Sequence, residues 1–550
     1  MRSFARSVIA ILAATTLTAG SVGPGVPSNP DDKTILHVLN RIGFGARGGD
    51  VERVRQVGLS NYIDQQLHPE RIADTGMAAR LAGFETINKS SRQLAEEYFV
   101  PMLQARQQAR KQAGNAVGTD AAATAETKDE GKPRRTPEQM ELERKERAVL
   151  VELGDQKILR AAYSERQLEE VMTDFWFNHF NVFAGKGATR DYLTEYERDA
   201  IRPHVFGKFH DLLEATARSP AMLFYLDNWQ SADPDAQNAK AQGRPRGGMF
   251  GRPGRNPRIG ARLPMPVPGT AQNPNAPPRQ KRGLNENYGR ELMELHTLGV
   301  DGGYTQQDVI NVARAFTGWT IDRPRQGGSF HFDDRLHDPR EKIVLGHKIK
   351  SGGGQSDGEQ VLDILAKHPS TARFISTKLV RRFVSDTPPP ALVDRAAARF
   401  RETDGNIREV LRTILTSPEF FAADAYRAKV KTPFEFVVSA VRATGTLVDD
   451  ATPLVQAVRQ LGMPLYMCQP PTGYADRADA WVNTGALLNR MNFALQLVGG
   501  RMRGVQPGTT PVASVLANDV SPSTASTIAK ATDPNQVAAL TLGSPEFQRR

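Results

Sequence analysis

Apolar residues recur three and four positions apart along most of this chain, which limits the folds open to it. The pattern is clear in VLDILAKH (361–368), TARFISTKLVRRFV (371–384), IREVLRTIL (407–415) and PFEFVVSAVRAT (433–444). One face of an α-helix repeats every 3.6 residues, whereas a half-buried strand alternates every two. Alternation is scarce, and KIVLGHKIK (342–350) is the best strand candidate. We therefore predict a mainly α fold: a multi-helix globular assembly with at most a short β element, plus disordered inserts.

Three stretches without this periodicity divide the chain. Residues 106–147 form a charged insert with helix-forming ends and a flexible middle, 231–282 a basic linker, and 504–533 a flexible segment rich in Ser, Thr, Pro and Ala. Segments of this composition bury too little apolar surface to fold on their own. The helical parts that we expect between them cover residues 35–105, 148–230, 283–503 and 534–550.

The net charge of the chain, +10, lies mostly in the linker. Residues 231–282 hold ten Lys or Arg against Asp233 and Asp235, together with ten prolines. Because the rest of the chain is nearly neutral, we expect no specific nucleic-acid binding by a folded face. A solvated spacer is the commoner role of such a segment, and contact with an anionic surface is the alternative.

The first 23 residues have the layout of a secretory signal peptide. Two arginines precede an apolar run from Val8 to Leu17, and small residues follow it. We expect export to the periplasm or the medium, with no transmembrane segment after cleavage, because no later apolar run is long enough to span a bilayer. Cys468 is the one cysteine of the chain, so no internal disulfide and no cysteine-based metal site can form.

His179 lies among aromatic residues in MTDFWFNHFNVFAGKG (172–187). Projected on a helix, it falls in the apolar stripe with Trp176, while Asp174, Asn178 and Asn181 fall on the opposite face. The imidazole should therefore point inward. A core histidine with one satisfying hydrogen bond is the commoner interpretation, and a metal ligand or proton carrier is the alternative.

Glu291 lies on a second helix, within GLNENYGRELMELHTLGVDGGYTQQDVINVARAFTGW (283–319). Asn285 is expected to cap this helix and Gly299 to end it, and a capping pattern at Thr305–Asp308 predicts the next helix, through Phe316. Glu291 falls at the edge of the apolar stripe, where a carboxylate must be paired, hydrogen-bonded or protonated. It is either a buried partner of an arginine such as Arg290, Arg314 or Arg381, or a general base or metal ligand.

The loop SFHFDDRLHDPREKIVLG (329–346) carries His331, Asp333, Asp334, His337 and Asp338 within eight residues. Imidazoles and carboxylates are ligands of divalent metals, but this spacing matches no closed metal motif. A divalent metal is therefore a candidate cofactor, but the spacing does not indicate which metal. Downstream, Asp357 is expected to cap the next helix, and MCQPPTGYADRADAWVN (467–483) forms either a pocket wall or a core plug.

These segments together resemble a known family, the bacterial domain of unknown function 1800. The resemblance rests on HVLNRIGFGARGGDVERVRQVGLSNYIDQQL (37–67), MTDFWFNHFNVF, NENYGRELMELHTLGVDGGYTQQDVINVARAFTGW, HDPREKIVLG and LGSPEFQRR, among others, from residue 37 to the C-terminus. The resemblance implies an exported, largely helical protein without an assigned chemistry. The positions that match its pattern are Asn178, His179, Asn285, Glu286, Asn287, Arg290, Glu291, Trp319, His337 and Asp338.

Two hypotheses follow. In the first, the chain is an envelope scaffold or binding protein whose polar and aromatic motifs form a buried site, with an envelope protein as a candidate partner. In the second, it is an exported metal-assisted or general-base hydrolase using His179, Glu291, His337 and Asp338, with Asn178 and Arg290 orienting them. The first is favoured because no complete catalytic motif is present. Convergence of His179, Glu291 and His337 in space would favour the second.

Overall fold

A computed structural model describes residues 25–117, 136–235, 283–517 and 519–550 of the chain. Helices dominate it, and the strands form three antiparallel pairs, so the predicted mainly α fold is confirmed. The signal peptide expected at 1–23 lies outside the described residues, as do the middle of the 106–147 insert and most of the 231–282 linker. Within the described ranges, no helix is both long and apolar enough to cross a membrane.

The longer helices of the first half are α1 (Asp32–Ile42), α2 (Asp50–Val57), α3 (Leu59–Leu67), α4 (Thr75–Leu81), α6 (Val100–Val117), α7 (Pro137–Tyr163), α8 (Gln167–His179), α9 (Thr189–Glu195), α10 (Phe209–Arg218) and α11 (Pro220–Tyr225). Those of the second half are α13 (Glu286–Glu291), α14 (Gln306–Ala315), α15 (Ser356–Lys367), α16 (Pro369–Phe383), α17 (Pro390–Glu402), α18 (Ile407–Leu415), α19 (Pro433–Thr444), α20 (Thr452–Gln460), α21 (Thr484–Val498), α22 (Pro522–Ile528), α23 (Pro534–Gly543) and α24 (Pro545–Gln548). The strands are β1 (Trp319–Ile321), β2 (Phe330–Phe332), β3 (Lys342–Val344), β4 (His347–Ile349), β5 (Leu447–Val448) and β6 (Val505–Gln506).

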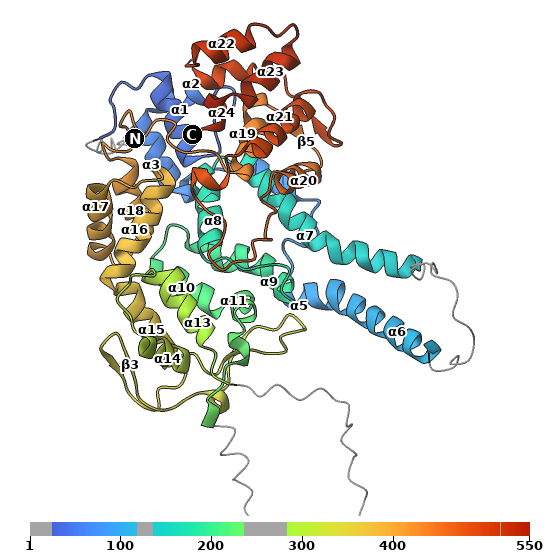
Figure 1. Cartoon of the computed structure of the whole chain (residues 1–550), viewed down its shortest axis with the longest axis vertical. Coiled ribbons are helices and arrows are strands. Elements are labelled where there is room, and N and C mark those ends of the chain that lie inside the picture. Colours follow the sequence, from blue (N-terminus) through green and yellow to red (C-terminus); the bar gives the residue numbers. More distant parts are fainter. Residues whose placement is uncertain (1–24, 118–135, 236–282, 518) are drawn as a thin grey trace, which may run out of the picture.

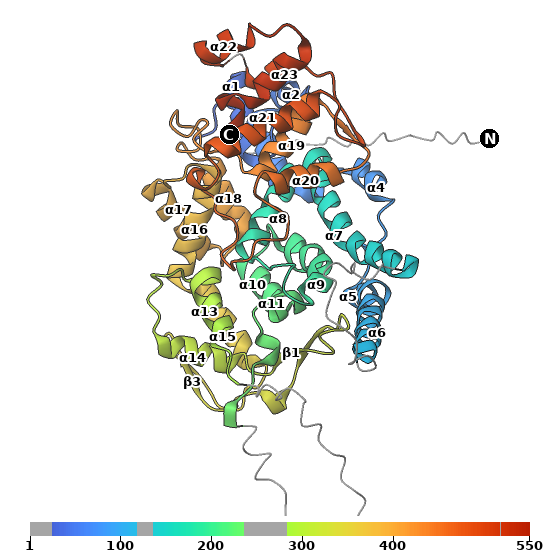
Figure 2. The same ribbon diagram turned by 45° about the vertical axis from the view of Figure 1, so that its right-hand side comes forward.

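The molecule is elongated, and its two ends are built from different parts of the chain (Figure 1). The N-terminal helices α1 and α2 lie beside the C-terminal helices α21–α24 at one end, and α13–α15 with β3 form the other. Helix α8 runs through the middle, and α16 lies beside it, as Figure 2 also shows. Helix α6 and the first part of α7 extend away from the body as a pair, while the second half of α7 is buried within it.

Helix α19 ties the N-terminal helices to the C-terminal ones. All its residues are buried, and the Thr432–Glu435 capping box fixes its start. Arg442 near its end donates to the carbonyl oxygens of Gly45 and Ala162, both at 2.7 Å, and pairs with Asp50 at 3.2 Å. A buried guanidinium of this kind needs several acceptors, and these come from two segments, residues 45–50 and the end of α7.

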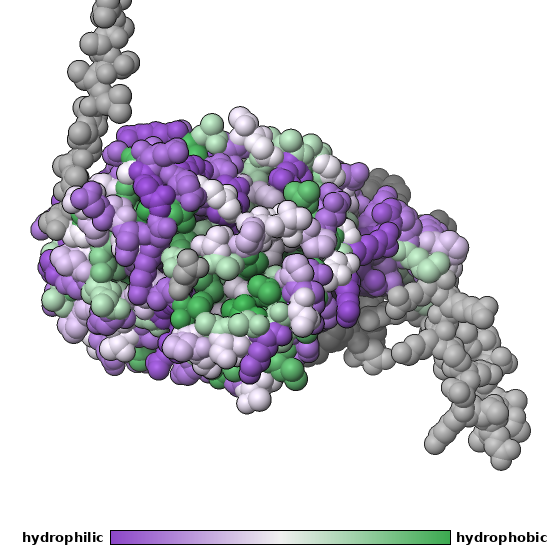
Figure 3. Space-filling view, turned by 90° about the horizontal axis from the view of Figure 1, so that it is seen from above, coloured by the Kyte–Doolittle hydropathy of each residue, from purple (hydrophilic) through white to green (hydrophobic). Residues whose placement is uncertain are grey.

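Figure 3 looks onto the end that holds the C-terminal helices and shows apolar side chains gathered around a hollow. A pocket of about 630 Å³ opens between α21, α23 and the loop that joins them, with Val498, Val512 and Val537 in its wall. Part of the 504–533 segment is helical here: α22 begins at the Ser521 cap with Pro522 in its first turn. Local capping thus gives short helices to a stretch whose composition indicated none.

The strand candidate at 342–350 is a hairpin. Strands β3 and β4 pair with Val344 opposite His347, and the two linking residues, Leu345 and Gly346, have φ values of 50° and 78°. Two consecutive positive φ values define the tight turn that suits antiparallel strands, and the second position is where glycine is favoured. The other two strand pairs are two or three residues long, too short to show an alternating pattern.

Candidate functional site

His179 is the last residue of α8 and is 2% exposed, so its predicted inward orientation is correct. Its ring lies edge-on to Trp176 and Phe180, with centroid distances of 5.4 and 4.5 Å. Aromatic residues thus exclude water from most of the imidazole. The chemistry of the ring therefore depends on the groups that its two nitrogens contact.

The imidazole contacts a backbone carbonyl on one side and an amine on the other. Nε2 lies 3.0 Å from the carbonyl oxygen of His296, and Nδ1 lies 2.7 Å from Nζ of Lys378. Because a carbonyl only accepts, Nε2 carries the hydrogen and Nδ1 presents its lone pair to the amine. Burial, then the Lys378 cation, holds the pKa of His179 well below its ordinary value, so the ring is neutral.

The carbonyl of His296 is available because of an irregular helix end. The predicted helix over 286–298 begins at the Asn285 cap, but its second half is a π-helical segment, η6 (Leu292–Thr297). His296 lies in the last turn, where carbonyls lack a donor from their own helix. Helices widened in this way are frequent at functional sites.

Lys378, on α16, is the second functional group. Burial lowers its pKa to about 8, with a further contribution from Arg381 against the opposing effect of Asp476. No carboxylate of the described residues lies within ion-pair distance of its amine. A neutral imidazole is therefore its nearest polar neighbour.

His179 and Lys378 open onto a pocket of about 240 Å³. The pocket lies between the end of α8, the middle of α16 and the loop that follows α20. Its wall comprises Asp174, Phe175, Asn178, His179, Lys378, Arg381, Arg382, Thr432, Met463, Thr472, Tyr474, Ala475, Asp476 and Arg477. The 467–483 loop takes both of the roles considered for it: residues 472–477 form pocket wall, and Trp481 is buried in the core.

Most charges around the pocket are already neutralised by neighbours. Four of the pairs are Asp174–Lys157 at 2.9 Å, Asp476–Lys429 at 2.9 Å, Arg477–Asp479 at 3.5 Å and Arg382–Glu435. Arg381 has no hydrogen-bond or ion-pair partner within the described ranges, and its Nε is buried. Lys378 and Arg381 therefore remain as two cationic groups facing the cavity.

Asn178 holds the loop against α8. Its side-chain amide donates to the carbonyl of Tyr474 at 2.8 Å, and its oxygen accepts from the Tyr474 N–H at 2.7 Å. Gly473 has a φ of +72°, and a Cβ there would lie 2.2 Å from the carbonyl oxygen of Asn178. Only glycine allows this approach.

The prediction that Asn181 faces outward is wrong. It is buried, and its amide donates to the carbonyl oxygens of Cys468 and Pro470 at 3.0 and 2.8 Å. Helix α8 ends at His179, so the helical projection does not extend to Asn181. Within α8 itself, the 467–483 loop packs on the polar face at Asn178, so that part of the face is not open to solvent.

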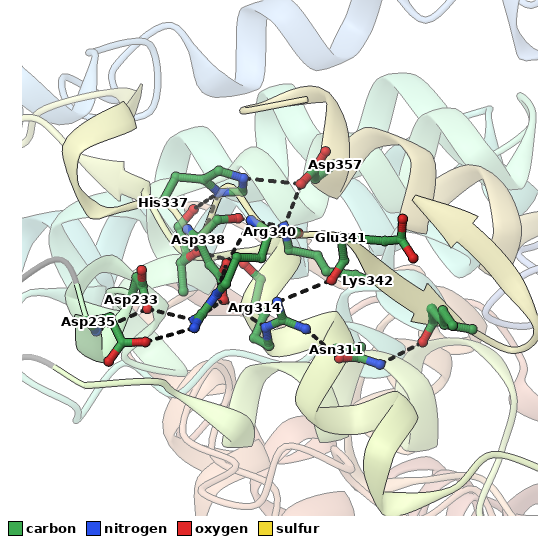
Figure 4. Close-up of polar contacts among 12 residues, drawn as sticks. Asp233, Asp235, Asn311, Arg314, His337, Asp338, Arg340, Glu341, Lys342 and Asp357 are labelled. Carbon is green, nitrogen blue, oxygen red and sulfur yellow. Dashed lines mark hydrogen bonds and ion pairs between the residues drawn. The ribbon is translucent and has the colours of Figure 1, made fainter. Parts of the chain in front are cut away.

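His337 belongs to a second buried network, just before β3, at the end of the molecule that α13–α15 form; Figure 4 shows its contacts. Its Nδ1 lies 2.9 Å from the carbonyl of Thr317, and its Nε2 lies 3.2 Å from Oδ2 of Asp357. The same oxygen accepts from Lys342 at 2.6 Å. The helix α15 begins at Ser356, so Asp357 is not its cap as predicted; its carboxylate instead neutralises a buried lysine.

Asp338 is fully buried beside this network and pairs with two arginines. Arg314 and Arg340 each lie 2.7 Å from its Oδ2, and Arg340 also reaches Asp233 and Asp235 (Figure 4). Burial acts to raise the pKa of Asp338, but hydrogen bonds from the two guanidinium groups hold it well below the ordinary value. The carboxylate is therefore saturated with donors.

Glu291 is half-buried at the end of α13 and meets neither histidine. Burial, then the nearby Glu294, raises its pKa against the opposing effect of Arg290. The three arginines considered as partners are placed otherwise: Arg290 donates to Gln306, Arg314 pairs with Asp338, and Arg381 faces the pocket. Glu291 has no hydrogen-bond or ion-pair partner in the described part of the chain.

The other predicted site residues hold the fold together. Asn285 caps α13 and donates to the carbonyl of Leu226 at 2.7 Å. Glu286 accepts from Gln306 at 2.8 Å, and the N–H of Asn287 donates to the Asn285 cap. Trp319 is fully buried, and its ring lies 4.8 Å from that of Phe316.

The four proposed catalytic residues thus do not form one constellation. His179 meets His296 and Lys378, His337 meets Thr317 and Asp357, and Asp338 meets Arg314 and Arg340. Glu291 makes no hydrogen bond or ion pair with any of the three. In residues 25–117, 136–235, 283–517 and 519–550, no three His, Cys, Asp or Glu side chains group as a metal site would require. The sequence interpretation missed Lys378 and His296, whose contacts with His179 join distant segments, and it considered Arg381 only as a partner of Glu291.

Comparison with known proteins gives a family and no activity. No curated protein and no solved structure matches the chain. A family model described as "Protein of unknown function (DUF1800)" matches residues 37–549, which is most of the chain, and the chain therefore belongs to that family, as its motifs predicted.

Proposed function

We propose that this protein is an exported binding protein of the cell envelope that holds a small organic anion in the pocket between α8 and α16. The observation that carries the proposal is the pair of cations, Lys378 and Arg381, that face the cavity without a carboxylate partner among the described residues. Partly buried cations are normally paired, so two half-buried cations that are not paired make a site where an anion is stabilised.

The size and lining of the pocket define the ligand class. Pockets for drug-sized ligands measure about 300–1,000 Å³, and this one, at about 240 Å³, suits a smaller molecule. Phe175 and Met463 form the apolar part of the pocket wall. Asn178 and Tyr474 also line the pocket, and their two mutual hydrogen bonds hold the wall in place. A short carboxylate or phosphate monoester with a few carbon atoms fits this combination of charge and volume.

The spacing of the two cations favours recognition of a carboxylate. Residues three apart on a helix have Cβ atoms about 5–6 Å from each other, so Lys378 and Arg381 reach the same small ligand. Arginine binds carboxylates through two parallel hydrogen bonds, and the buried amine adds a second charge. The export part of the proposal rests on the layout of residues 1–23.

Titration calorimetry of the full mature chain with malonate tests the binding proposal. We expect saturable binding of malonate and no measurable binding of malonamide, its neutral analogue. Arg381→Gln should weaken malonate binding about 10- to 100-fold, because a charge-assisted hydrogen bond is lost. Arg477→Gln is the matched control, since Arg477 lines the same pocket but pairs with the exposed Asp479, and it should change the affinity less than about threefold.

Two outcomes would contradict the proposal. Equal affinities for malonate and malonamide would show that charge does not select the ligand. Equal losses in Arg381→Gln and Arg477→Gln would show that the unpaired guanidinium has no special role. Cell fractionation of the native host tests the location separately, and recovery of the chain in the cytoplasm would remove the export part.

A further inference from the structure

Lys378, which is half-buried at the edge of its pocket, differs from the buried lysines of the described chain. Lys157, Lys342 and Lys429 each pair with an aspartate. Lys431 donates to the hydroxyl of Ser439 at 2.7 Å, in a cavity of about 20 Å³ that has room for about one water. Lys378 alone among these five combines the absence of a carboxylate partner with a pocket large enough for an organic ligand.

We propose that Lys378 condenses with the carbonyl carbon of a small 2-oxo acid held in this pocket, forming an imine. The inference rests on the proposed function and names its ligand: the carboxylate meets Arg381, and the adjacent carbonyl meets the amine. The two groups are neighbours in a 2-oxo acid, as Lys378 and Arg381 are one helical turn apart on α16.

The environment of the amine supports this role. An amine reacts with a carbonyl only through its neutral form, and a lysine without a carboxylate partner gains little from staying charged. With a pKa near 8, about a tenth of the amine is neutral at pH 7, against about one in a few thousand at the ordinary lysine pKa. Burial that depresses a lysine pKa is the usual means of preparing an imine-forming amine.

The condensation balances without an oxidant or reductant. The lone pair of Nζ attacks the carbonyl carbon, a C–N bond forms, and the carbonyl oxygen takes a proton to become a hydroxyl. Loss of that hydroxyl with the second amine hydrogen releases one water and leaves a C=N bond. His179 Nδ1, 2.7 Å from Nζ, accepts the first amine proton after the attack and delivers it to the carbonyl oxygen, so this is the proton that forms the hydroxyl.

The hydrogen bond from Nε2 to the His296 carbonyl keeps this lone pair directed at the amine. His179 therefore orients the amine and carries its proton. His296, which acts through His179, is a positioning residue.

Reductive trapping tests the inference on the full mature chain. Pyruvate with sodium cyanoborohydride at pH 7.5 should give one reduced adduct per chain by intact mass, located at Lys378 by peptide mapping. Excess malonate should slow the trapping at least tenfold by occupying the anion site. Lys431 is the internal control: its pKa is lowered further, to about 7, but its cavity excludes pyruvate, so it should remain unmodified.

Lys378→Arg separates imine formation from anion binding. Arginine keeps the positive charge and cannot form the imine, so the adduct should vanish while malonate binding stays within about tenfold. Malonate binding without any adduct at Lys378 in the wild type would overturn the imine and leave the proposed function standing. Adducts spread equally over exposed lysines would also overturn it. Absence of both malonate binding and adduct would overturn the two proposals together.

Discussion

The two buried histidine sites use similar groups to different ends. At one end of the molecule, His337 and Lys342 share the carboxylate of Asp357. In the middle, His179 and Lys378 contact each other and no carboxylate of the described residues. The first network satisfies its charges internally, so it stabilises the fold. The second network leaves the Lys378 amine and the Arg381 guanidinium without a carboxylate partner. The pocket beside them has room for an anionic ligand that would neutralise them.

The largest expected effect is a loss of stability in the network of His337, Lys342 and Asp357, whose charges are already paired. Asp357→Asn removes the charge that neutralises Lys342, whose side chain is 0% exposed, and should lower the free energy of unfolding by about 3–5 kcal/mol. Urea denaturation followed by circular dichroism measures this. Asp363→Asn on the same helix is the control, because Asp363 pairs with Lys367 at the surface, and it should cost at most about 1 kcal/mol. Similar losses in both variants would contradict the assignment of a structural role to Asp357.

The wall of the pocket gives the next effect. Gly473→Ala forces a Cβ against the Asn178 carbonyl at a positive φ, so it should destabilise the fold by about 1–3 kcal/mol and weaken malonate binding. Gly462→Ala is matched, because Gly462 also has a positive φ, +96°, but open space around it. It should cost less and leave malonate binding unchanged. Equal effects on binding would mean that the Asn178–Tyr474 contact does not shape the site.

The pH dependence of binding distinguishes Lys378 from a permanently charged group. Malonate remains a dianion from pH 6.5 to 9.5, while Lys378, with a pKa of about 8, loses its proton within this range. Malonate affinity should therefore fall about tenfold as the pH rises through 8, and Lys378→Arg should flatten the profile. The charged or titratable groups around this amine are Asp174, His179, His296, Arg381, Arg382, Tyr474, Asp476 and Arg477.

The same group predicts a trend in stability. Because the folded pKa of Lys378 lies below its unfolded value, the unfolded chain binds more protons between pH 8 and about 10.5, and this lysine makes the free energy of unfolding rise with pH in that window. The slope should be smaller in Lys378→Met. An unchanged slope would mean that Lys378 titrates normally in the folded chain.

The sequence predicted the features that depend on neighbouring residues. The helix periodicity, the Asn285 cap and the Thr305–Asp308 capping box are local, and each was confirmed. The inward direction of His179 follows from one helix and was also correct. Composition misled at 504–533, where caps create short helices.

The partners of the site could not be predicted in this way. His296 and Lys378 lie 117 and 199 residues from His179, and no local pattern fixes such pairs. In TARFISTKLVRRFV, Lys378 and Arg381 have the spacing of an ordinary basic helix face. They form a site only because α16 packs against α8 and the loop that follows α20. The π-helical segment at 292–297 likewise has no signature in the apolar spacing.

The smallest expected effect concerns Glu291, which the hydrolase hypothesis made the base. Because burial raises its pKa, its charged form is disfavoured in the folded chain, and Glu291→Gln should increase the free energy of unfolding at pH 7 by at most about 1 kcal/mol. The gain should shrink as the pH falls toward 4.5, because the wild-type carboxyl takes up its proton. Malonate affinity and pyruvate trapping should not change, since Glu291 does not line the pocket. A loss of malonate affinity or of pyruvate trapping by more than about threefold would place Glu291 in the ligand site. It would then support the hydrolase hypothesis, in which Glu291 and His179 share one site.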